Sequence, residues 1–147
     1  MSVTVKIKKL RPGAKLPHYG SAYAAGADLC ACTDAPVEIA PHATVLVPTG
    51  LAAEIPEGYA GLIYARSGLA SKRGLAPANK VGVVDADYRG EIMVALHNHS
   101  DVAQTIEADE RIAQLVITPF LAASFLESDE LSDTVRGAGG FGSTGRV

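Results

Sequence analysis

Val3-Thr-Val-Lys-Ile-Lys-Lys9 carries the pattern that decides the fold class of this chain. Val3, Val5 and Ile7 alternate with polar residues, so in an extended segment these apolar side chains would face one side. Similar short runs recur at residues 37–39, 44–48, 61–64, 91–96, 105–106 and 113–117, separated by Gly and Pro. Strands about 8–12 residues apart with such turns predict an all-β sandwich, jelly roll or barrel.

Length and composition indicate a single domain. The 147 residues are enough to bury a hydrophobic core. A net charge of −3 argues against binding polymeric nucleic acid, although a few arginines could still hold a small anion. Neither a signal peptide nor a membrane span is recognisable, so we expect a soluble, cytoplasmic protein with no membrane partner. Cys30 and Cys32 are too close for an ordinary disulfide and too few for a zinc site, which predicts reduced, partly buried thiols.

Ser67-Gly-Leu-Ala-Ser-Lys-Arg-Gly74 interrupts the strand pattern. Ser67 is a favourable N-cap, and Gly74 follows two basic residues as a favourable C-cap, which predicts one short helix. The free amides at its N-terminus would suit a phosphate oxygen, and Arg66 could add a bidentate contact. Alternatively, the segment is purely structural and Arg66 pairs with a surface carboxylate.

Gly82-Val-Val-Asp-Ala-Asp-Tyr-Arg-Gly90 places two carboxylates and a phenol between glycines, a composition typical of a hairpin tip. Asp85 could orient and deprotonate a water molecule if it is placed accurately, because its ordinary pKa of about 3.9 makes it a weak base. Asp85 and Asp87 could equally be solvated turn residues. Residue types alone leave both interpretations open.

His97-Asn-His99 places two imidazoles on the same face of a strand. Such a pair could form half of a metal site. No third ligand is evident beside it in the sequence, so the pattern favours surface or subunit-contact histidines.

Arg136-Gly-Ala-Gly-Gly-Phe-Gly-Ser-Thr-Gly145 combines a cation, an aromatic ring and two hydroxyls with five glycines. A P-loop is excluded, because no lysine precedes Ser143 and only three residues follow Thr144. Taken alone, the segment is either a contact surface for phosphates and a base or a mobile tail. We therefore expect a β domain over residues 1–135 and a Gly-rich arm over residues 136–147.

Five segments resemble, in order, the five motifs of trimeric dUTP diphosphatases (dUTPases). They are Ala25–Cys30, Ala65–Ala70, Gly82–Gly90, Glu110–Gln114 and Arg136–Gly145. The resemblance spans almost the whole chain and implies a jelly-roll-like β-barrel that forms a homotrimer. It also implies active sites at subunit interfaces, with the C-terminal arm of one subunit closing a site built by others.

The resemblance further implies hydrolysis of dUTP to dUMP and pyrophosphate, which would limit uracil incorporation into DNA and supply dUMP for dTMP synthesis. Asp85 would activate the water that attacks the α-phosphorus, Tyr88 would pack under the deoxyribose, and Asp28 would hold Mg²⁺ through water. The implied substrate contacts are Arg66, Ser67, Gly68, Asn79, Gly82, Val83, Val84, Asp85, Tyr88, Met93, Gln114, Arg136, Phe141, Gly142, Ser143 and Thr144.

The match has departures and two rivals. Ala65 stands where many members have Pro, and Asp109 precedes Glu110-Arg111 where a Gly-Asp pair is common. Neither position belongs to the groups assigned to chemistry. The rivals are a dCTP deaminase-like enzyme, which has a related fold and trimer, and a non-enzymatic jelly-roll module for assembly or regulation.

Overall fold

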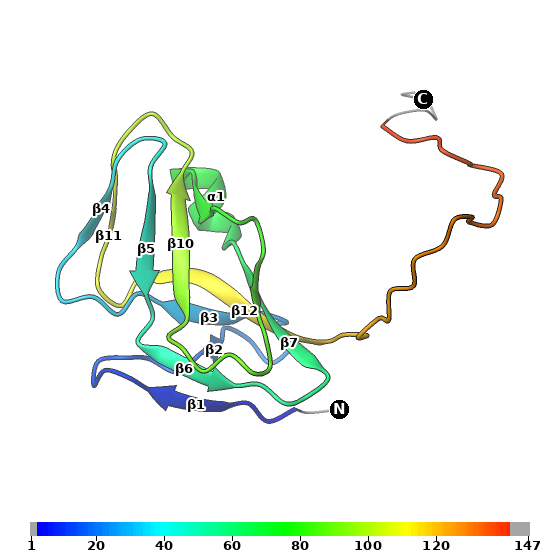
Figure 1. The fold of residues 1–147 in the computed structure, drawn as a ribbon. Helices are drawn as coiled ribbons and strands as arrows, with labels where there is room; N and C mark the ends of the chain where they lie inside the picture. Colours follow the sequence, from blue (N-terminus) through cyan, green and yellow to red (C-terminus); the bar gives the residue numbers. More distant parts are fainter. Residues whose placement is uncertain (1–2, 142–147) are drawn as a thin grey trace.

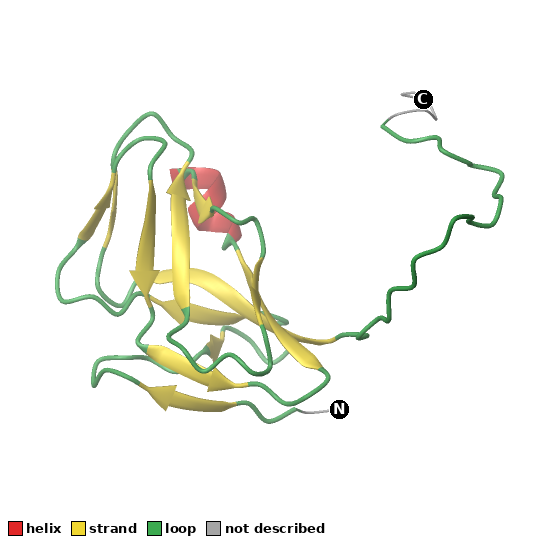
Figure 2. Cartoon of the chain, in the orientation of Figure 1, coloured by secondary structure: helices red, strands yellow, loops and turns green. Residues whose placement is uncertain are grey.

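The computed structural model describes residues 3–141 and has a mostly β architecture with one short helix (Figures 1 and 2). Its elements are β1 (Lys6–Lys9), β2 (His18–Tyr19), β3 (Ala27–Cys30), β4 (Val37–Ile39), β5 (Thr44–Pro48), β6 (Leu51–Glu54), β7 (Tyr59–Tyr64), α1 (Ser67–Arg73), β8 (Leu75–Pro77), β9 (Gly82–Val84), β10 (Met93–Asn98), β11 (Gln104–Ile106) and β12 (Arg111–Pro119). This architecture confirms the predicted all-β, jelly-roll-like fold.

The strands pair into antiparallel ladders that enclose an aliphatic core. The largest sheet has the order β2-β3-β12-β7-β9, and a second has the order β5-β10-β8. Two further pairs, β1-β6 and β4-β11, complete the ladders among the described residues. The large aliphatic side chains that are fully buried between them are Leu29, Ile39, Leu51, Leu75, Ile92, Leu96, Ile106 and Ile112.

Strand β7 lies inside the largest sheet, paired with β12 on one edge and β9 on the other. A Cβ atom on Gly61, near its middle, would lie 2.9 Å from Ile55 Cδ1 and 3.0 Å from Leu115 Cδ1. Atoms that close would have to shift, so glycine lets the core pack directly against the β7 backbone. Gly61 is also the cross-strand partner of Val84, the last residue of β9, so this part of β7 lies beside the strand that leads directly into Asp85.

Helix α1 begins one position earlier than the sequence pattern predicts. Arg66 occupies the N-cap position with extended backbone and no side-chain cap, so Ser67 is the first helical residue rather than the cap. The C-cap prediction is confirmed, because Gly74 has φ 66° and its amide bonds to the Ala70 carbonyl oxygen. Leu69 is the buried residue that attaches the helix to the core.

The segment from Gly82 to Gly90 is not the tip of a hairpin. Strand β9 pairs with β7, whereas β10 pairs with β5 and β8, so the two flanking strands lie in different ladders. Residues 85–92 therefore cross between sheets. A hairpin assignment from Gly and Asp residues identifies the turn but not the pairing partners, which come from distant parts of the chain.

Beyond β12, residues 120–141 run away from the body as an extended segment (Figure 1). The last backbone hydrogen bond to the body joins the Phe120 amide to the Gly58 carbonyl oxygen. Cys30 and Cys32 are free and partly buried, as predicted. Within the part of the chain that is described, no helix has the length and apolar character needed to cross a membrane.

Asn98 is the most heavily bonded buried polar side chain of the body. It is fully buried, its Nδ2 donates to the carbonyl oxygens of Ile39, Ala40 and Val102, and its Oδ1 accepts from the amide and hydroxyl of Ser100. We expect Asn98→Ala to lower the free energy of unfolding by about 2–4 kcal/mol, because several buried groups lose their partner. Urea denaturation measures the loss. The exposed Asn79→Ala change is the control, and an equally small effect at both positions would contradict this assignment.

Candidate active site

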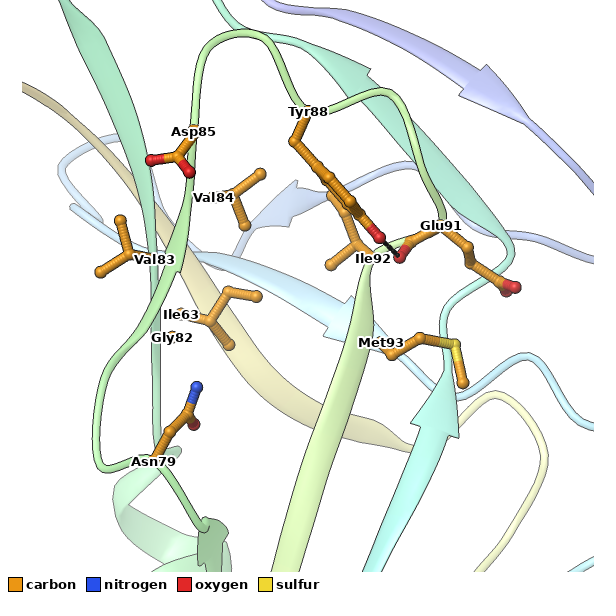
Figure 3. Close-up of a pocket in the computed structure, with 10 residues that line it drawn as sticks. All are labelled: Ile63, Asn79, Gly82, Val83, Val84, Asp85, Tyr88, Glu91, Ile92 and Met93. Carbon is orange, nitrogen blue, oxygen red and sulfur yellow. Dashed lines mark hydrogen bonds between the residues drawn. The ribbon is translucent and has the colours of Figure 1, made fainter.

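A cavity of about 230 Å³ lies between β9 and the start of β10 (Figure 3). We call it the Asp85 pocket. Its lining residues are Ile63, Asn79, Gly82, Val83, Val84, Asp85, Tyr88, Glu91, Ile92 and Met93. The backbone of β9 forms one wall, and Tyr88, Ile92 and Met93 stand across from it (Figure 3). The pocket therefore combines the exposed Asp85 carboxylate with apolar side chains and with the backbone of β9.

Gly82 keeps the β9 wall thin. A Cβ atom there would approach Ile63 Cβ to 3.2 Å and Asn79 Nδ2 to 3.3 Å, which is tighter than ordinary packing. Val84 is buried and holds the strand to the core, whereas Val83 and Asp85 are exposed. The wall therefore offers backbone groups to the cavity and carries the carboxylate at its rim.

Tyr88 forms the flat opposite wall and is held at both ends. Its amide donates to the Asp85 carbonyl oxygen at 3.2 Å, and its Oη donates to the Glu91 carbonyl oxygen at 2.9 Å. A Cβ atom on Gly90 would lie only 2.4 Å from Tyr88 Oη. Only a residue without a side chain at position 90 leaves room for the ring in this orientation.

A second group of polar residues surrounds Asp28 on β3, and we call Asp28, Arg66 and Arg111 the Asp28 cluster. Asp28 Oδ1 accepts a hydrogen bond from Arg66 Nε at 2.8 Å, and Oδ2 accepts one from Arg111 Nη1 at 3.2 Å. The Asp28 side chain is 14% exposed, and Arg66 is 27% exposed. The carboxylate thus fixes one guanidinium at the start of α1 and a second on β12, while most of their N–H groups remain available for an anion.

Gln114 lies beside this cluster, in register with Asp28 on β3 and Tyr64 on β7. Its Nε2 donates to the Ala65 carbonyl oxygen at 2.8 Å. A Cβ atom on Gly26 would fall 2.3 Å from Gln114 Oε1, so the glycine makes room for the amide. The segment that leads from β7 into α1 is therefore tied to β12 next to Arg66.

The Asp85 pocket and the Asp28 cluster lie at different ends of β7. The register pairs Val84 with Gly61, which places Asp85 level with Ala60, whereas Arg66 follows the opposite end of the strand. Six residues at a rise of about 3.3 Å each separate these levels by roughly 20 Å. One chain therefore does not bring Asp85 and Arg66 together around a single small ligand.

Several of the residues expected from the sequence do lie together. Asn79, Gly82, Val83, Val84, Asp85, Tyr88 and Met93 line one cavity. Asp28 and Arg66 are bonded to each other and lie beside Gln114, Ser67 and Gly68. Arg136 and Phe141 lie in the extended segment, where Arg136 Nε donates to the Gly139 carbonyl oxygen at 2.7 Å. Gly142, Ser143 and Thr144 fall outside the described residues.

Two further residues at these sites are missed by reasoning from the sequence. Arg111 contacts Asp28 from 83 positions away, and Glu91 lines the pocket while its Oε1 accepts a hydrogen bond from the Gly50 amide at 2.8 Å. Arg111 lies within one of the five motif segments, which is a signal that could have drawn attention to it. No local pattern marks Glu91, because its partner comes from the turn between β5 and β6.

Fold and site together define an all-β jelly-roll protein with a carboxylate pocket and a separate arginine cluster. The family model described as dUTPase matches residues 13–145. The deoxyuridine 5'-triphosphate nucleotidohydrolase of Hydrogenobaculum sp. (strain Y04AAS1) is 53% identical over 139 residues, covering 95% of this chain and 96% of that protein. Its counterpart in Thiobacillus denitrificans is 49% identical and covers 97% and 98%. The chain belongs to the dUTPase family.

Solved structures agree with this assignment. The Staphylococcus bacteriophage 80alpha dUTPase with dUPNHPP superposes with a TM-score of 0.89 at 30% sequence identity, covering 97% of this chain and 98% of that one. A variant of the dUTPase from phage phi11 of S. aureus, whose structure describes a structural Mg(II) ion, has a TM-score of 0.77 at 26% identity and covers 86% and 97%. The fold of this chain is therefore the dUTPase fold.

Proposed function

We propose that this protein is a dUTP diphosphatase, converting dUTP and water to dUMP and pyrophosphate as a Mg²⁺-assisted homotrimer. The observation that carries the proposal is the exposed Asp85 carboxylate at the rim of a pocket walled by Tyr88 and by strand backbone. The activity would limit uracil incorporation into DNA and supply dUMP for dTMP synthesis. The proposed setting is the cytoplasm, and the free Cys30 and Cys32 fit a reducing compartment.

The Asp85 pocket suits a deoxyuridine. Backbone groups from Gly82 to Asp85 can pair with the uracil edge much as a base would, because Gly82 leaves them uncovered. The Tyr88 ring packs under the deoxyribose and leaves no room for a ribose 2′-hydroxyl. Asn79 and Met93 line the same cavity and are proposed to contact the nucleotide. A small, fixed pocket also rejects the thymine methyl group.

The Asp28 cluster suits the triphosphate. Arg66 is held by Asp28, so its guanidinium is oriented before an anion arrives. The amides of Ser67 and Gly68 lie in the first turn of α1 and have no partner within the helix. Gln114 lies beside them. Together these groups screen the negative charge that repels an attacking water and that grows on the leaving pyrophosphate.

Mg²⁺ fits this arrangement as an ion carried mainly by the nucleotide. Each Asp28 oxygen already accepts one arginine hydrogen bond and keeps one further acceptor site, which suits a water molecule of the ion's shell. The described residues contain no cluster of three or more His, Cys, Asp or Glu side chains that could form a protein cage. When bound, Mg²⁺ would neutralise phosphate charge.

Asp85 performs the remaining step. Its carboxylate accepts a proton from one water molecule, and the water oxygen forms a bond to the α-phosphorus. The bond from the α-phosphorus to the bridging oxygen breaks, and pyrophosphate leaves with that oxygen and its electron pair. Because charge is screened by other groups, Asp85 has only to orient the water and remove its proton.

A homotrimer is proposed because one chain does not complete this site. Asp85 and Arg66 must act on the same nucleotide, and the roughly 20 Å between them along β7 prevents that within one chain. A second copy therefore has to bring its Asp28 cluster to the Asp85 pocket of the first. The arm is proposed to come from a third copy, with Arg136, Ser143 and Thr144 on the γ-phosphate, Gly142 near them, and Phe141 stacked on the uracil.

The extended segment exposes apolar side chains, which favours its docking on another surface. Its apolar side chains Leu121, Phe125, Leu126, Leu131 and Val135 are each at least 90% exposed. The body carries a matching apolar groove of about 630 Å³, lined by Val3, Val5, Ile7, Leu16, Pro17, Tyr19, Ala27, Leu115 and Ile117. We propose that residues 121–135 of one copy occupy this groove on a neighbouring copy, because the hydrophobic effect favours covering both surfaces.

A pyrophosphate assay with dUTP, dTTP, UTP and dCTP tests the proposed function. We expect selective turnover of dUTP, and Asp85→Asn should lower kcat roughly 10²–10⁴-fold because the base is lost. Calorimetry with dUPNHPP should give a nearly unchanged affinity for the Asp85→Asn variant, since asparagine has nearly the same size and shape as aspartate. Unchanged kcat in Asp85→Asn would remove Asp85 from its role, broad turnover would contradict the pocket assignment, and ammonia release from dCTP would indicate a deaminase.

Gly90→Ala tests the position of the Tyr88 ring. The added Cβ displaces the phenol, and we expect kcat/KM for dUTP to fall roughly ten- to a hundredfold, as small misplacements in active sites commonly do. Discrimination against UTP should weaken at the same time. Gly13→Ala is the matched control, because no atom lies within 4 Å of its added Cβ. Equal kinetics in the two variants would show that the ring position does not matter.

Two truncations separate the roles of the arm. A chain ending at Val135 should assemble as a trimer and lose most of its activity, because Arg136 and Phe141 are removed. A chain ending at Pro119 should also assemble less tightly, because the apolar segment is gone. Light scattering at several concentrations measures assembly, and pyrophosphate release measures activity. A fully active chain ending at Val135 would contradict the proposed closure.

A further inference from the structure

Two histidines at the far end of β10 from the Asp85 pocket form a close pair. His97 lies within β10 and His99 follows its last residue. Their side chains lie on the same face, with ring centroids 4.4 Å apart and the ring planes inclined at 66°. Met93, at the other end of the strand, lines the pocket. The pair is therefore separate from the groups proposed to handle the nucleotide.

The spacing of the two rings fits two imidazoles on one metal ion. With metal–nitrogen bonds of about 2.0 Å, two bound imidazoles have centroids roughly 4.5 Å apart at a 90° ligand angle and about 5.2 Å apart at a tetrahedral angle. The observed 4.4 Å is close to the first of these spacings, and the two rings meet edge to face. Square-planar nitrogen sites of that kind are typical of Cu²⁺ and Ni²⁺.

A neighbouring strand orients one of the rings. His97 Nδ1 lies 2.9 Å from Thr44 Oγ1, and Thr44 is its cross-strand partner on β5. This hydrogen bond leaves His97 Nε2 as the atom available to a metal. Ligating histidines commonly bond through their second ring nitrogen to a neighbouring polar group, and here the Thr44 hydroxyl orients the ring.

Basic side chains surround the pair. Lys80 and His42 are the nearest charged or titratable groups beside the two rings. His42 is itself bonded to Asp101, with Nε2 and Oδ1 2.9 Å apart. The positive charge of Lys80 opposes a bound cation and therefore limits its affinity.

We propose that His97 and His99 bind one divalent transition-metal ion, with Cu²⁺ and Ni²⁺ preferred and water completing the coordination. The affinity order should be Cu²⁺ above Ni²⁺ and Zn²⁺, and Mg²⁺ should not compete because it prefers oxygen ligands. No third His, Cys, Asp or Glu joins them among residues 3–141, so the site is an open two-histidine chelate. It is distinct from the nucleotide-borne Mg²⁺ proposed at Asp28.

Calorimetric titration tests the proposal. The full-length protein is titrated, without nucleotide, with Cu²⁺, Ni²⁺, Zn²⁺ and Mg²⁺ in turn. We expect His97→Asn and His99→Asn each to weaken Cu²⁺ binding at least about tenfold, and Thr44→Val to weaken it by about tenfold through loss of the orienting bond. Electron paramagnetic resonance of bound Cu²⁺ should show two nitrogen ligands in the unchanged protein and fewer in either histidine variant.

Two controls make the result specific. His18→Asn removes an exposed histidine on β2, and Asp28→Asn removes the proposed Mg²⁺ contact, and both should bind Cu²⁺ like the unchanged protein. Turnover of dUTP with Mg²⁺ should be the same in His99→Asn as in the unchanged protein. Cu²⁺ affinity that survives both His97→Asn and His99→Asn, or that is lost with Asp28→Asn, would overturn the assignment.

Discussion

The pairing of β7 on both of its edges is the constraint on which the rest of this structure depends. One edge carries β12 and, through it, Asp28 on β3, and the other edge carries β9 with Asp85. Gly61 lets Ile55 and Leu115 pack against the strand itself. A rigid central strand therefore fixes both the position of each polar group and the distance that keeps them apart.

Asp28 restrains the charged side chains of Arg66 and Arg111 by bonding to both. A carboxylate with little exposure that bonds to two arginines loses hydration, and such a pair adds little to stability. Its value lies in orientation, because Arg66 and Arg111 cannot fold back against unrelated surface carboxylates. The interpretation of Arg66 as a structural ion pair and its proposed role as an anion contact are therefore compatible, since the ion pair would orient the guanidinium for the proposed anion.

In this chain, local sequence patterns predict the bounds of strands and helices well, but they predict poorly which strands pair with one another. Strands β4 and β5 have the expected limits, and Gly74 ends α1 as its sequence indicates. The hairpin interpretation wrongly pairs β9 with the strand that follows it, whereas β9 pairs with β7. The contact of Arg111 with Asp28 is also missed. Both interactions join positions tens of residues apart, which a local pattern does not indicate. Roles for Asp85 and Tyr88 come from family resemblance, while the cavity that unites them comes from a crossing between two ladders.

The length of β7 has a consequence for how the activity would depend on protein concentration. If Asp85 and Arg66 must come from different copies, a dissociated chain has every required side chain and no working site. Dilution below the assembly threshold would then silence the protein without unfolding it, and the initial rate would rise more steeply than linearly with chain concentration. Because β7 keeps Asp85 and Arg66 apart, the turnover rate per chain would then depend on the fraction of chains that are assembled.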